Sequence, residues 1–292
     1  MKNASQVTIA RSLVEALPYV QHFAGKVVVI KVGGTSMSTE TLVDSLALDL
    51  VLLRAVGVRV VLVHGGGPAV SAMGERLGLK PRFVDGLRVT DEDTMRVAQM
   101  VQIGGISRDL LASIGRHGGQ AVGLSAHDGG GWLRGVRRKH ISRETGEEVD
   151  LGRVGDVVSV DTMLLKTQLD AGFIPVIAPV ALDDDFRPLN VNADSVATAV
   201  ASALRAPRLL FLSDVDGIHG PTGWVNQVSV EMLRSWIDSG VVSGGMVPKA
   251  EACLNAVSSG IGRVSIVDGR GPHAALVELL TDAGVGTLVY TD

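Results

Sequence analysis

Short, strongly apolar runs alternate with stretches of helical periodicity along most of the chain. The runs predict strands at Val27–Val32, Arg59–His64, Ala121–Leu124, Ile174–Pro179, Arg208–Leu212, Val264–Val267 and Thr287–Tyr290. Apolar residues at helical spacing predict helices over Thr39–Ala55, Ala69–Leu77, Asp91–Gly104, Ser107–His117, Thr162–Ala171, Ser195–Leu204, Val230–Ser239 and Lys249–Ser258. Because apolar strands joined by helical crossovers form mainly parallel sheets covered on both faces, the chain is predicted to be an α/β protein.

Three segments depart from this alternation. The polar, glycine-bearing stretch Trp132–Val158 predicts a hairpin inserted into the α/β pattern, which either covers a substrate or is peripheral. An aspartate-rich turn at Ala181–Pro188 marks the predicted boundary between two lobes. Apolar positions at helical spacing near the N-terminus, including Leu13 and Leu17, predict an amphipathic helix. That helix could pack on its own domain, which the pattern alone favours, or on a neighbouring subunit.

The composition excludes several classes of function. With a net charge of −4 and 3% aromatic residues, the chain offers neither a basic field nor a stacking platform for nucleic acid. The single Cys253 rules out an internal disulfide and indicates a reducing compartment, and its helical surroundings predict a small buried side chain. No run of about 18 apolar residues and no cleavable leader is found, so a cytoplasmic protein without a membrane partner is expected.

Two lysines beside glycine-rich turns are the strongest candidates for chemistry. Lys31 closes the first predicted strand and leads into Gly33 and Gly34, and Lys249 follows the turn Gly244–Pro248. A turn that presents backbone N–H groups beside an ammonium group can bind an anion. Either lysine alone could be a surface residue beside an ordinary turn. Two such turns from opposite ends of the chain predict a polyanion held between two lobes, most simply a nucleotide triphosphate.

A third glycine cluster, His64–Pro68, joins a predicted strand to a predicted helix. Free N–H groups and the positive end of the helix dipole at such a turn attract an anion. The cluster is not a Walker A loop, because no Gly-Lys-Ser/Thr follows, and its glycine spacing does not fit the dinucleotide fingerprint. His64 itself is more often a structural residue at a strand end than an acid or base.

Polar side chains further along are candidates for substrate contacts. Arg88, in Asp85–Thr90, could hold a carboxylate bidentately or form a structural ion pair. In an extended segment Asn190, Asn192 and Asp194 point the same way, so the amides could bind substrate and the carboxylate could hold the lysine ammonium groups. Asp194 could equally cap the following helix, and the two roles can coexist.

The turn after the predicted strand Arg208–Leu212 is a candidate for nucleotide contacts, because open α/β sheets bind ligands at the carboxyl ends of their strands. Its candidate residues are Ser213, Asp214 and Gly217. A calcium loop is disfavoured because the spacing and the distal glutamate of an EF-hand are missing. No Cys/His cluster or HExxH motif supports a protein-bound transition metal.

Taken in order, these segments resemble the amino-acid kinase superfamily, and within it the kinases of N-acetyl-L-glutamate. The resemblance runs from about Val27 to Thr287 and is carried by KVGG, HGGGP, FVDGLRVTDEDTM, AVGLS, DLGRVGDV, AGFIPVIAP, NVNAD, LSDVDGI, SGGMVPKAEA and DGRGPHA. KVGG and GGG recur across the superfamily, whereas FVDGLRVT followed by NVNAD and SGGMVPK is far more specific. The resemblance implies a three-layer αβα sandwich around a mainly parallel central sheet.

The resemblance also implies an activity and a role for each candidate residue. The γ-phosphoryl group of ATP would pass to the side-chain carboxylate of N-acetyl-L-glutamate in arginine biosynthesis, with Mg²⁺ bound through the ATP phosphates. Lys31 and Lys249 would stabilise the phosphoryl group in transfer, with Asp194 organising both lysines. The other implied contacts are Gly33 and Gly34 with the nucleotide, and Gly65, Gly66, Arg88, Asn190 and Asn192 with the acyl amino acid. Since a carboxylate is ionised near neutral pH, no general base is needed.

Both ends of the chain resemble the arginine-inhibited, hexameric branch, in which N-terminal helices interlace dimers into a trimer of dimers. The helix around Tyr19 and the stretch Gly269–Gly286 imply L-arginine as an inhibitor, contacted by Tyr19, His273, Glu278 and Gly284. The implied domains are an oligomerisation helix (1–22), a lobe for the acyl amino acid and dimerisation (23–185) and a lobe for ATP and arginine (186–292).

The chain departs from the family pattern at two places. It has Gly104-Gly105-Ile106-Ser107 where relatives often have Gly-Lys-Val-Asn, and Ser125-Ala126-His127-Asp128 where Ser-Gly-Lys-Asp is usual. Both stretches lie in the predicted substrate lobe, so a kinase of an aminoadipate-type or carrier-linked acidic amino acid stays an alternative. A non-catalytic arginine or nucleotide sensor is a second alternative, which the presence of Lys31, Asp194 and Lys249 disfavours.

Overall fold

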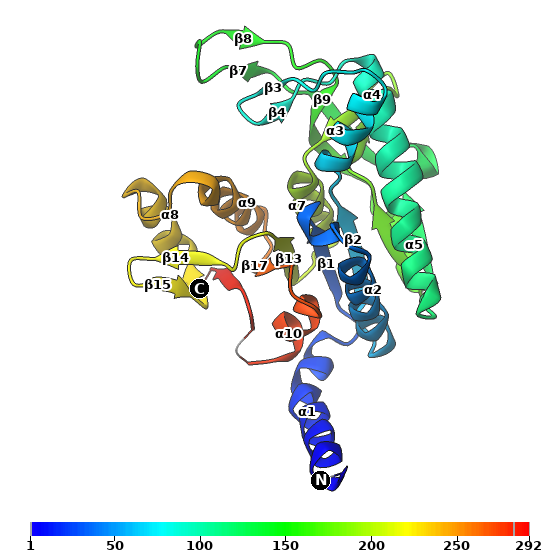
Figure 1. Cartoon of the computed structure of the whole chain (residues 1–292), viewed down its shortest axis with the longest axis vertical. Helices are drawn as coiled ribbons and strands as arrows, with labels where there is room; N and C mark the ends of the chain where they lie inside the picture. The colour runs from blue at the N-terminus through cyan, green and yellow to red at the C-terminus, as the bar shows by residue number, and fades with distance from the viewer. Residues whose placement is uncertain (1, 283, 292) are drawn as a thin grey trace.

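The computed structural model describes residues 2–282 and 284–291, and a large twisted sheet forms its centre (Figure 1). The strand order is β16-β18-β17-β13-β1-β2-β10-β5. The bounds are β1 (Val27–Val32), β2 (Arg59–His64), β5 (Ala121–Leu124), β10 (Ile174–Ile177), β13 (Arg208–Ser213), β16 (Gln227–Ser229), β17 (Arg263–Asp268) and β18 (Thr287–Tyr290). Every neighbouring pair is parallel except β17 and β18. The predicted mainly parallel sheet is therefore confirmed.

Helices cover both faces of this sheet, because successive side chains of a strand point to opposite faces. Along β1, Val28 and Ile30 enter one hydrophobic core and Val29 enters the other. The first core is closed by α2 (Glu40–Ala55), α5 (Ser107–Arg116) and α10 (Ala274–Leu280). The second core is closed by α6 (Met163–Asp170), α7 (Ala193–Ala203), α8 (Val230–Asp238) and α9 (Val247–Ser258). The three-layer αβα sandwich is confirmed.

A smaller β assembly lies at the end of the molecule near α3 (Gly67–Arg76) and α4 (Glu92–Gln99) (Figure 1). Four strands close into a ring: β6 (Leu133–Arg137), β9 (Val154–Val160), β11 (Val180–Leu182) and β12 (Pro188–Val191). Two hairpins extend beyond it: β3 (Phe83–Val84) with β4 (Leu87–Arg88), and β7 (His140–Ile141) with β8 (Glu148–Val149). The predicted inserted hairpin thus corresponds to the antiparallel pair β6–β9.

The predicted lobe boundary falls within a hairpin of this ring. The turn at Ala181–Pro188 joins β11 to β12, which pair antiparallel, and β12 also pairs with β9. The first residues of the predicted second lobe therefore hydrogen-bond to strands of the first. A final hairpin, β14 (Ile218–Gly220) with β15 (Gly223–Val225), lies at one side of the molecule, beside α8 (Figure 1).

One long helical element replaces the two helices predicted between residues 91 and 117. After α3 (Gly67–Arg76), α4 (Glu92–Gln99) runs into a π-helix, Met100–Ile106, and on into α5 without a break. The Ser107 N–H donates to the Gln102 carbonyl, five residues back, which is the hydrogen bond of a π-turn. The predicted break at Gly104 is wrong, because the π-turn absorbs the glycines while keeping the backbone hydrogen-bonded.

The N-terminal helix α1 (Lys2–Phe23) projects from the body of the molecule (Figure 1). Leu13 is 71% exposed and Leu17 49% exposed, so the expectation that this face packs on its own domain is wrong. The end of α1 contacts α10 instead. Among the described residues, none of the helices is both long and apolar enough to span a bilayer.

Candidate active site

The glycine turns converge because the strands that carry them are parallel neighbours. Val32 of β1 lies in register with His64 of β2 and with Leu212 of β13. The turns that follow these strands therefore emerge at one edge of the sheet. The Gly33 N–H donates to the Leu212 carbonyl, and the Gly65 N–H donates to the Val32 carbonyl, at 3.0 and 2.9 Å.

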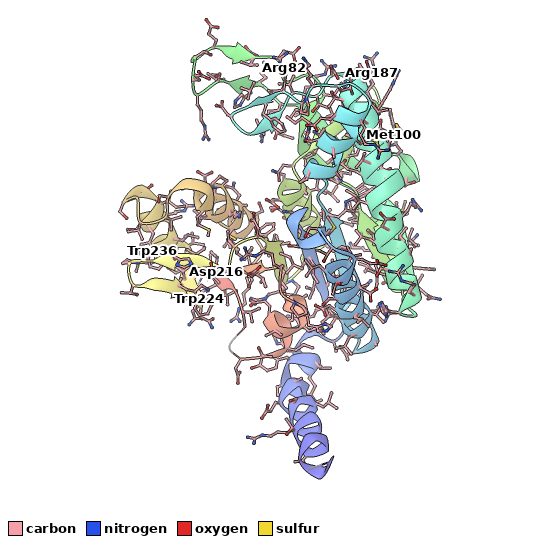
Figure 2. The ribbon with its side chains drawn as sticks, viewed as in Figure 1. Arg82, Met100, Arg187, Asp216, Trp224 and Trp236 are labelled. Carbon is pink, nitrogen blue, oxygen red and sulfur yellow. The ribbon has the colours of Figure 1, made fainter. Side chains whose placement is uncertain are left out.

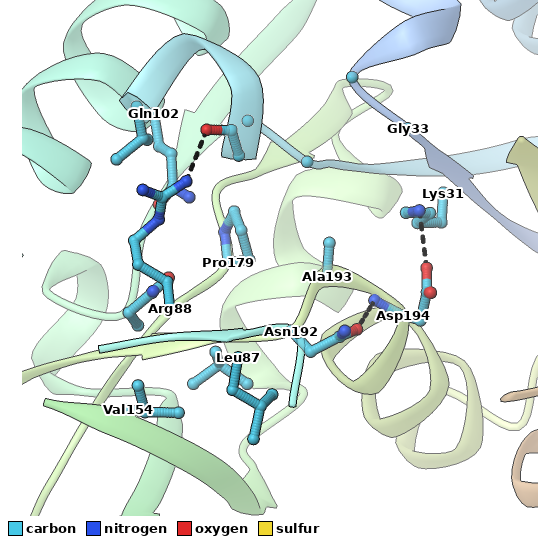
Figure 3. Close-up of a pocket in the computed structure, with 18 of the residues that line it drawn as sticks. Lys31, Gly33, Leu87, Arg88, Gln102, Val154, Pro179, Asn192, Ala193 and Asp194 are labelled. Carbon is cyan, nitrogen blue, oxygen red and sulfur yellow. Dashed lines mark hydrogen bonds and ion pairs between the residues drawn. The ribbon is translucent and has the colours of Figure 1, made fainter. Parts of the chain in front are cut away.

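A cavity of about 310 Å³ opens at this edge (Figure 3). This volume is at the lower end of the range for small-molecule sites. The predicted site residues that line it are Lys31, Gly33, Gly34, Gly65, Gly66, Arg88, Asn190, Asn192 and Asp194. Ser213, Asp214, Gly217 and Lys249 do not line it. The cavity therefore gathers the residues assigned to the acyl amino acid together with Lys31, Asp194 and the first glycine turn.

Lys31 and Asp194 form an ion pair at the cavity wall, with 2.8 Å between Nζ and Oδ1 (Figure 3). Asp194 lies in the first turn of α7, where sequence alone left open whether it caps the helix. The cap is Asn192, whose Oδ1 accepts from the N–H groups of Asp194 and Ser195 at 2.7 and 3.3 Å. Because Asn192 satisfies these donors, the Asp194 carboxylate is left for the lysine.

Arg88 is held in place by neutral groups. Its Nη2 donates to the Gly67 carbonyl at 2.8 Å and to Ser71 Oγ at 2.7 Å, and its guanidinium lies 4.7 Å from the centre of the Phe83 ring. No described carboxylate pairs with it, so the alternative of a structural ion pair is not observed. Burial lowers the pKa of Arg88 from its ordinary value, but a guanidinium remains charged at neutral pH. The cavity therefore contains a cation that is held in position and has further N–H donors for a ligand.

His64 is a structural residue, as its place at a strand end suggested. The ring is fully buried, and burial lowers the pKa of His64 to about 4, so the ring is neutral at pH 7. Nδ1 lies 2.9 Å from the Gly65 carbonyl, and Nε2 lies 2.8 Å from Ser107 Oγ. Because a carbonyl only accepts, Nδ1 carries the hydrogen and Nε2 accepts from the Ser107 hydroxyl. His64 thus ties the glycine turn to the start of α5.

Lys249 lies in the first turn of α9 and pairs with Asp214, not with Asp194. The Lys249 contact is the largest cause of the lowered pKa of Asp214. Helix α9 nevertheless packs against α7. Burial, followed by the charge of Asp194, raises the pKa of the Cys253 thiol, one turn along α9 from Lys249. Lys249 is therefore carried by a helix that runs close to Asp194, although the two side chains do not touch. The predicted burial of Cys253 is confirmed.

The candidate nucleotide residues lie beyond the end of β13. Ser213 Oγ donates to Asp214 Oδ1 at 3.2 Å, and the Gly269 N–H donates to the Ser213 carbonyl at 2.8 Å. Gly217 has φ of 138°, and a Cβ there would lie 2.6 Å from both Thr287 Oγ1 and Trp224 Nε1. Only glycine fits this close approach.

Sequence reasoning missed one polar side chain of the cavity. Gln102, in the π-helix, lines the cavity although its neighbours in the sequence are apolar. The signal was a single carboxamide on the inward face of a helix that also buries Met95 and Ala98. Without the register of the π-turn, the direction of this side chain could not be derived.

A second, larger cavity of about 840 Å³ lies between α1 and the C-terminal segment. Of the residues assigned to arginine, Tyr19, Glu278 and Gly284 line it. His273 lies elsewhere: its Nδ1 is 2.7 Å from Oδ1 of the buried Asp49 on α2.

Comparison with known proteins defines the class. Residues 26–268 match the amino acid kinase family, and the chain belongs to that family. Within it, the chain is 48% identical over 284 residues to a protein of Symbiobacterium thermophilum called acetylglutamate kinase, covering 96% of this chain and 97% of the relative. A protein of Methanocaldococcus jannaschii with the same name is 44% identical over 289 residues, covering 97% and 96%.

Solved structures agree with this fold. N-acetylglutamate synthase from Neisseria gonorrhoeae, complexed with coenzyme A and N-acetyl-glutamate, matches with a TM-score of 0.83 and 27% identity. The match covers 97% of this chain and 63% of the synthase chain. The same synthase complexed with coenzyme A and L-arginine matches with a TM-score of 0.81 and 25% identity, over 97% and 65%. Carbamate kinase from Giardia lamblia bound to AMP-PNP, at 17% identity and a TM-score of 0.64 over 92% and 99%, shares the fold.

Proposed function

We propose that this protein is an N-acetyl-L-glutamate kinase that forms N-acetyl-L-glutamyl 5-phosphate and ADP in arginine biosynthesis. The observation that carries the proposal is the cavity in which Lys31, Arg88 and the paired glycine turns meet. Cations and N–H donors at separate points of one cavity suit a substrate that has a carboxylate at each end. Relatives of nearly the same length that are called acetylglutamate kinase support the same substrate.

The chemistry needs no acid or base from the protein. An oxygen of the substrate's side-chain carboxylate attacks the γ-phosphorus of ATP, and the bond from that phosphorus to the oxygen of ADP breaks. Arg88 holds the α-carboxylate, with Asn190 beside it. Lys31 and the N–H groups of the glycine turns offset the charge on the transferring group. The neutral, buried His64 has no role in proton transfer.

The nucleotide is placed over the carboxyl end of β13, between Ser213 and the start of α9. A helix N-terminus favours an anion, and Lys249 in its first turn adds a cation. Asp214 then holds Lys249 until the phosphates arrive. In the described part of the chain no three acidic, histidine or cysteine side chains cluster for a metal ion. The ATP phosphates themselves would hold Mg²⁺.

A coupled assay of ADP release tests the proposal. With N-acetyl-L-glutamate, ATP and Mg²⁺, we expect turnover that depends on all three. L-Glutamate and N-acetyl-L-2-aminoadipate are the comparison substrates, because they lack the acetyl group and lengthen the side chain respectively. A higher kcat/KM for the aminoadipate derivative would reassign the substrate. If neither N-acetyl-L-glutamate, L-glutamate nor the aminoadipate derivative causes ADP release, the proposal is overturned.

We further propose that L-arginine inhibits the enzyme from the cavity beside α1. Tyr19 hydrogen-bonds Asp282 across this cavity, so a ligand there contacts both α1 and the C-terminal segment. The synthase complexed with L-arginine, which shares the fold over most of this chain, supports the same ligand. Titration of the kinase assay with L-arginine should lower the rate, and Tyr19→Phe should raise the arginine concentration needed. An unchanged rate at millimolar arginine would remove this proposal.

A further inference from the structure

We propose that Gln102 binds and orients the acylamino group of the substrate by accepting a hydrogen bond from its N–H. The inference rests on the proposed function and goes beyond it, because it identifies the side chain that binds the acylamino nitrogen. It starts from an unusual feature of the cavity wall: a buried carboxamide oxygen that has no hydrogen-bond partner among the described residues.

Gln102 is 4% exposed, and its Oε1 is buried without a hydrogen-bond partner among the described residues. A buried carbonyl without a donor costs free energy that a well-packed apolar side chain would not. Two side chains of the π-helix differ in exposure at this point. Met100 points to solvent and is 60% exposed, whereas Gln102 is directed inward and lines the cavity (Figures 2 and 3). An acceptor in a cavity wall is satisfied when a ligand brings the donor.

The position of Gln102 is set by the second glycine turn. A Cβ on Gly66 would lie 2.8 Å from Ile106 Cδ1 and 3.1 Å from Gln102 Cγ. The glycine therefore lets the turn lie directly against the π-helix. Arg88 contacts the same turn one residue later, through the Gly67 carbonyl. Gln102 and Arg88 thus line one cavity and are supported by adjacent residues.

The chemistry of the substrate indicates which of its groups donates to Gln102 Oε1. Ionised N-acetyl-L-glutamate has two carboxylates, one carbonyl and a single donor, the amide N–H. The cavity offers many donors to the carboxylates, but few acceptors. Asn192 Oδ1 is taken by the N–H groups of α7, and Asp194 by Lys31. The amide N–H and the α-carboxylate are attached to one carbon, so the acceptor must lie beside the group that holds the carboxylate. Gln102, supported next to Arg88, fits this requirement.

Asn190 is the rival acceptor. Its amide nitrogen donates to Thr90 Oγ1 at 3.2 Å, which orients the side chain and leaves Oδ1 as a second oxygen in the wall. Among the described residues, Gln102 Oε1 is a buried oxygen without a hydrogen-bond partner, whereas Asn190 Oδ1 is not. The difference favours Gln102 and makes Asn190 the alternative outcome of the test.

The test removes the donor on one side of the proposed hydrogen bond and the acceptor on the other. The probe is the ester analogue of the substrate, (S)-2-acetoxyglutarate, in which oxygen replaces the amide N–H. Affinities of N-acetyl-L-glutamate and of the ester are measured by calorimetry for the full chain, Gln102→Leu and Gln102→Met. The wild type should bind the amide roughly 10- to 100-fold more tightly than the ester, since the ester leaves the acceptor unpaired. Both variants should bring that ratio close to one by weakening the amide only.

Gln99→Leu is the matched control, because it makes the same chemical change in the same helical element without lining the cavity. It should keep the wild-type ratio. A wild-type ratio retained in both Gln102 variants, and lost in Asn190→Ala, would overturn the inference in favour of Asn190. Binding is read without turnover, so an inactive protein that still discriminates amide from ester would contradict the kinase proposal while leaving the role of Gln102 intact. Failure to bind either ligand would overturn both.

Discussion

The Lys31–Asp194 pair sets the charge of the cavity at the scale of single residues. The lysine side chain is 14% exposed, so its ammonium group is poorly hydrated and has one carboxylate partner. That partner is available only because Asn192, two residues earlier, caps α7. One amide therefore determines that a buried cation meets a carboxylate and remains beside the glycine turns. Lys249 and Asp214 form a second such pair, on the side proposed for the nucleotide.

Replacing either lysine by alanine should leave binding of the acyl substrate in place and slow the chemical step. Removal of a donor that stabilises a transition state lowers turnover by roughly 10²–10³. We therefore expect a loss of that order in kcat for Lys31→Ala and for Lys249→Ala, measured as ADP release at saturating substrates. Lys166→Ala, on an exposed face of α6, is the control and should be unaffected. Near-normal turnover in either active-site variant would show that its assigned role is wrong.

His64 should give the stability of the protein a distinct pH dependence. Its pKa is about 4 in the folded protein and 6.5 as its ordinary value, so the unfolded chain binds the extra proton first as the pH falls. The free energy of unfolding should therefore decrease from pH 6.5 to pH 4 and level off below, by roughly 3 kcal/mol in total. Chemical denaturation at several pH values, compared with His64→Gln, isolates this contribution. Equal pH slopes in both proteins would contradict the assignment.

At the scale of elements, two hairpins are joined by a single carboxylate. Asp85, at the tip of β3–β4, accepts from His140 Nε2 at 2.6 Å and from the Arg143 N–H at 2.9 Å on the β7–β8 hairpin. The hydrogen bond from Arg143 is the largest cause of the lowered pKa of Asp85, followed by that from His140. The β3–β4 hairpin carries Arg88 into the cavity wall. The outer hairpin therefore holds the hairpin that carries Arg88 in position.

Breaking this link should weaken substrate binding more than catalysis. In Asp85→Ala the β3–β4 hairpin loses both hydrogen bonds to its neighbour, so Arg88 becomes less well placed. We expect KM for the acyl substrate to rise several-fold, with a smaller change in kcat. Because the pKa of Asp85 is lowered, the wild-type link persists as the pH falls to the ordinary range of a carboxyl group and is lost only below it. Asp238→Ala, on the exposed side of α8, should leave both constants unchanged.

The projecting helix α1 is the main feature at the scale of the whole molecule. Its exposed apolar side chains include Leu13 and Leu17, which the described residues leave 71% and 49% exposed. A helix that presents such a face to solvent is best explained by burial in an assembly. This supports the proposed homohexamer, a trimer of dimers joined through α1. The same helix forms one wall of the proposed arginine cavity, so assembly and inhibition would share one element.

Removing residues 1–22 should convert the expected hexamer to dimers and abolish the proposed inhibition by arginine. Basal kinase activity should persist, because none of these residues lines the active-site cavity. Light scattering after gel filtration measures the mass, and the coupled assay measures activity with and without arginine. The double substitution Leu13→Asp and Leu17→Asp tests the apolar face without shortening the chain. A mass that stays unchanged in both variants would exclude α1 as the joint between dimers.

The sequence by itself determined every strand of the central sheet except β16, and most of the polar side chains of the cavity. Strands such as Val27–Val32 and Arg59–His64 were predicted with their observed ends. A strand buried on both faces is a continuous apolar run, and its ends can be recognised from the adjacent residues in the sequence. Their parallel order then brings the glycine turns to one edge, whatever the detailed packing. The apolar periodicity could not, however, reveal the π-turn, because a single π-turn shifts the helical repeat by one residue at one place only.

Tertiary structure alone decided which side chains meet. Whether Asn192 or Asp194 caps α7, and whether Lys249 pairs with Asp194 or Asp214, depends on how α7 and α9 dock on the sheet. The inward direction of Gln102 likewise follows from its contact with Gly66. These choices depend on distances between residues far apart in the chain. Local propensity contains no information about such distances, so they are settled only when the elements pack.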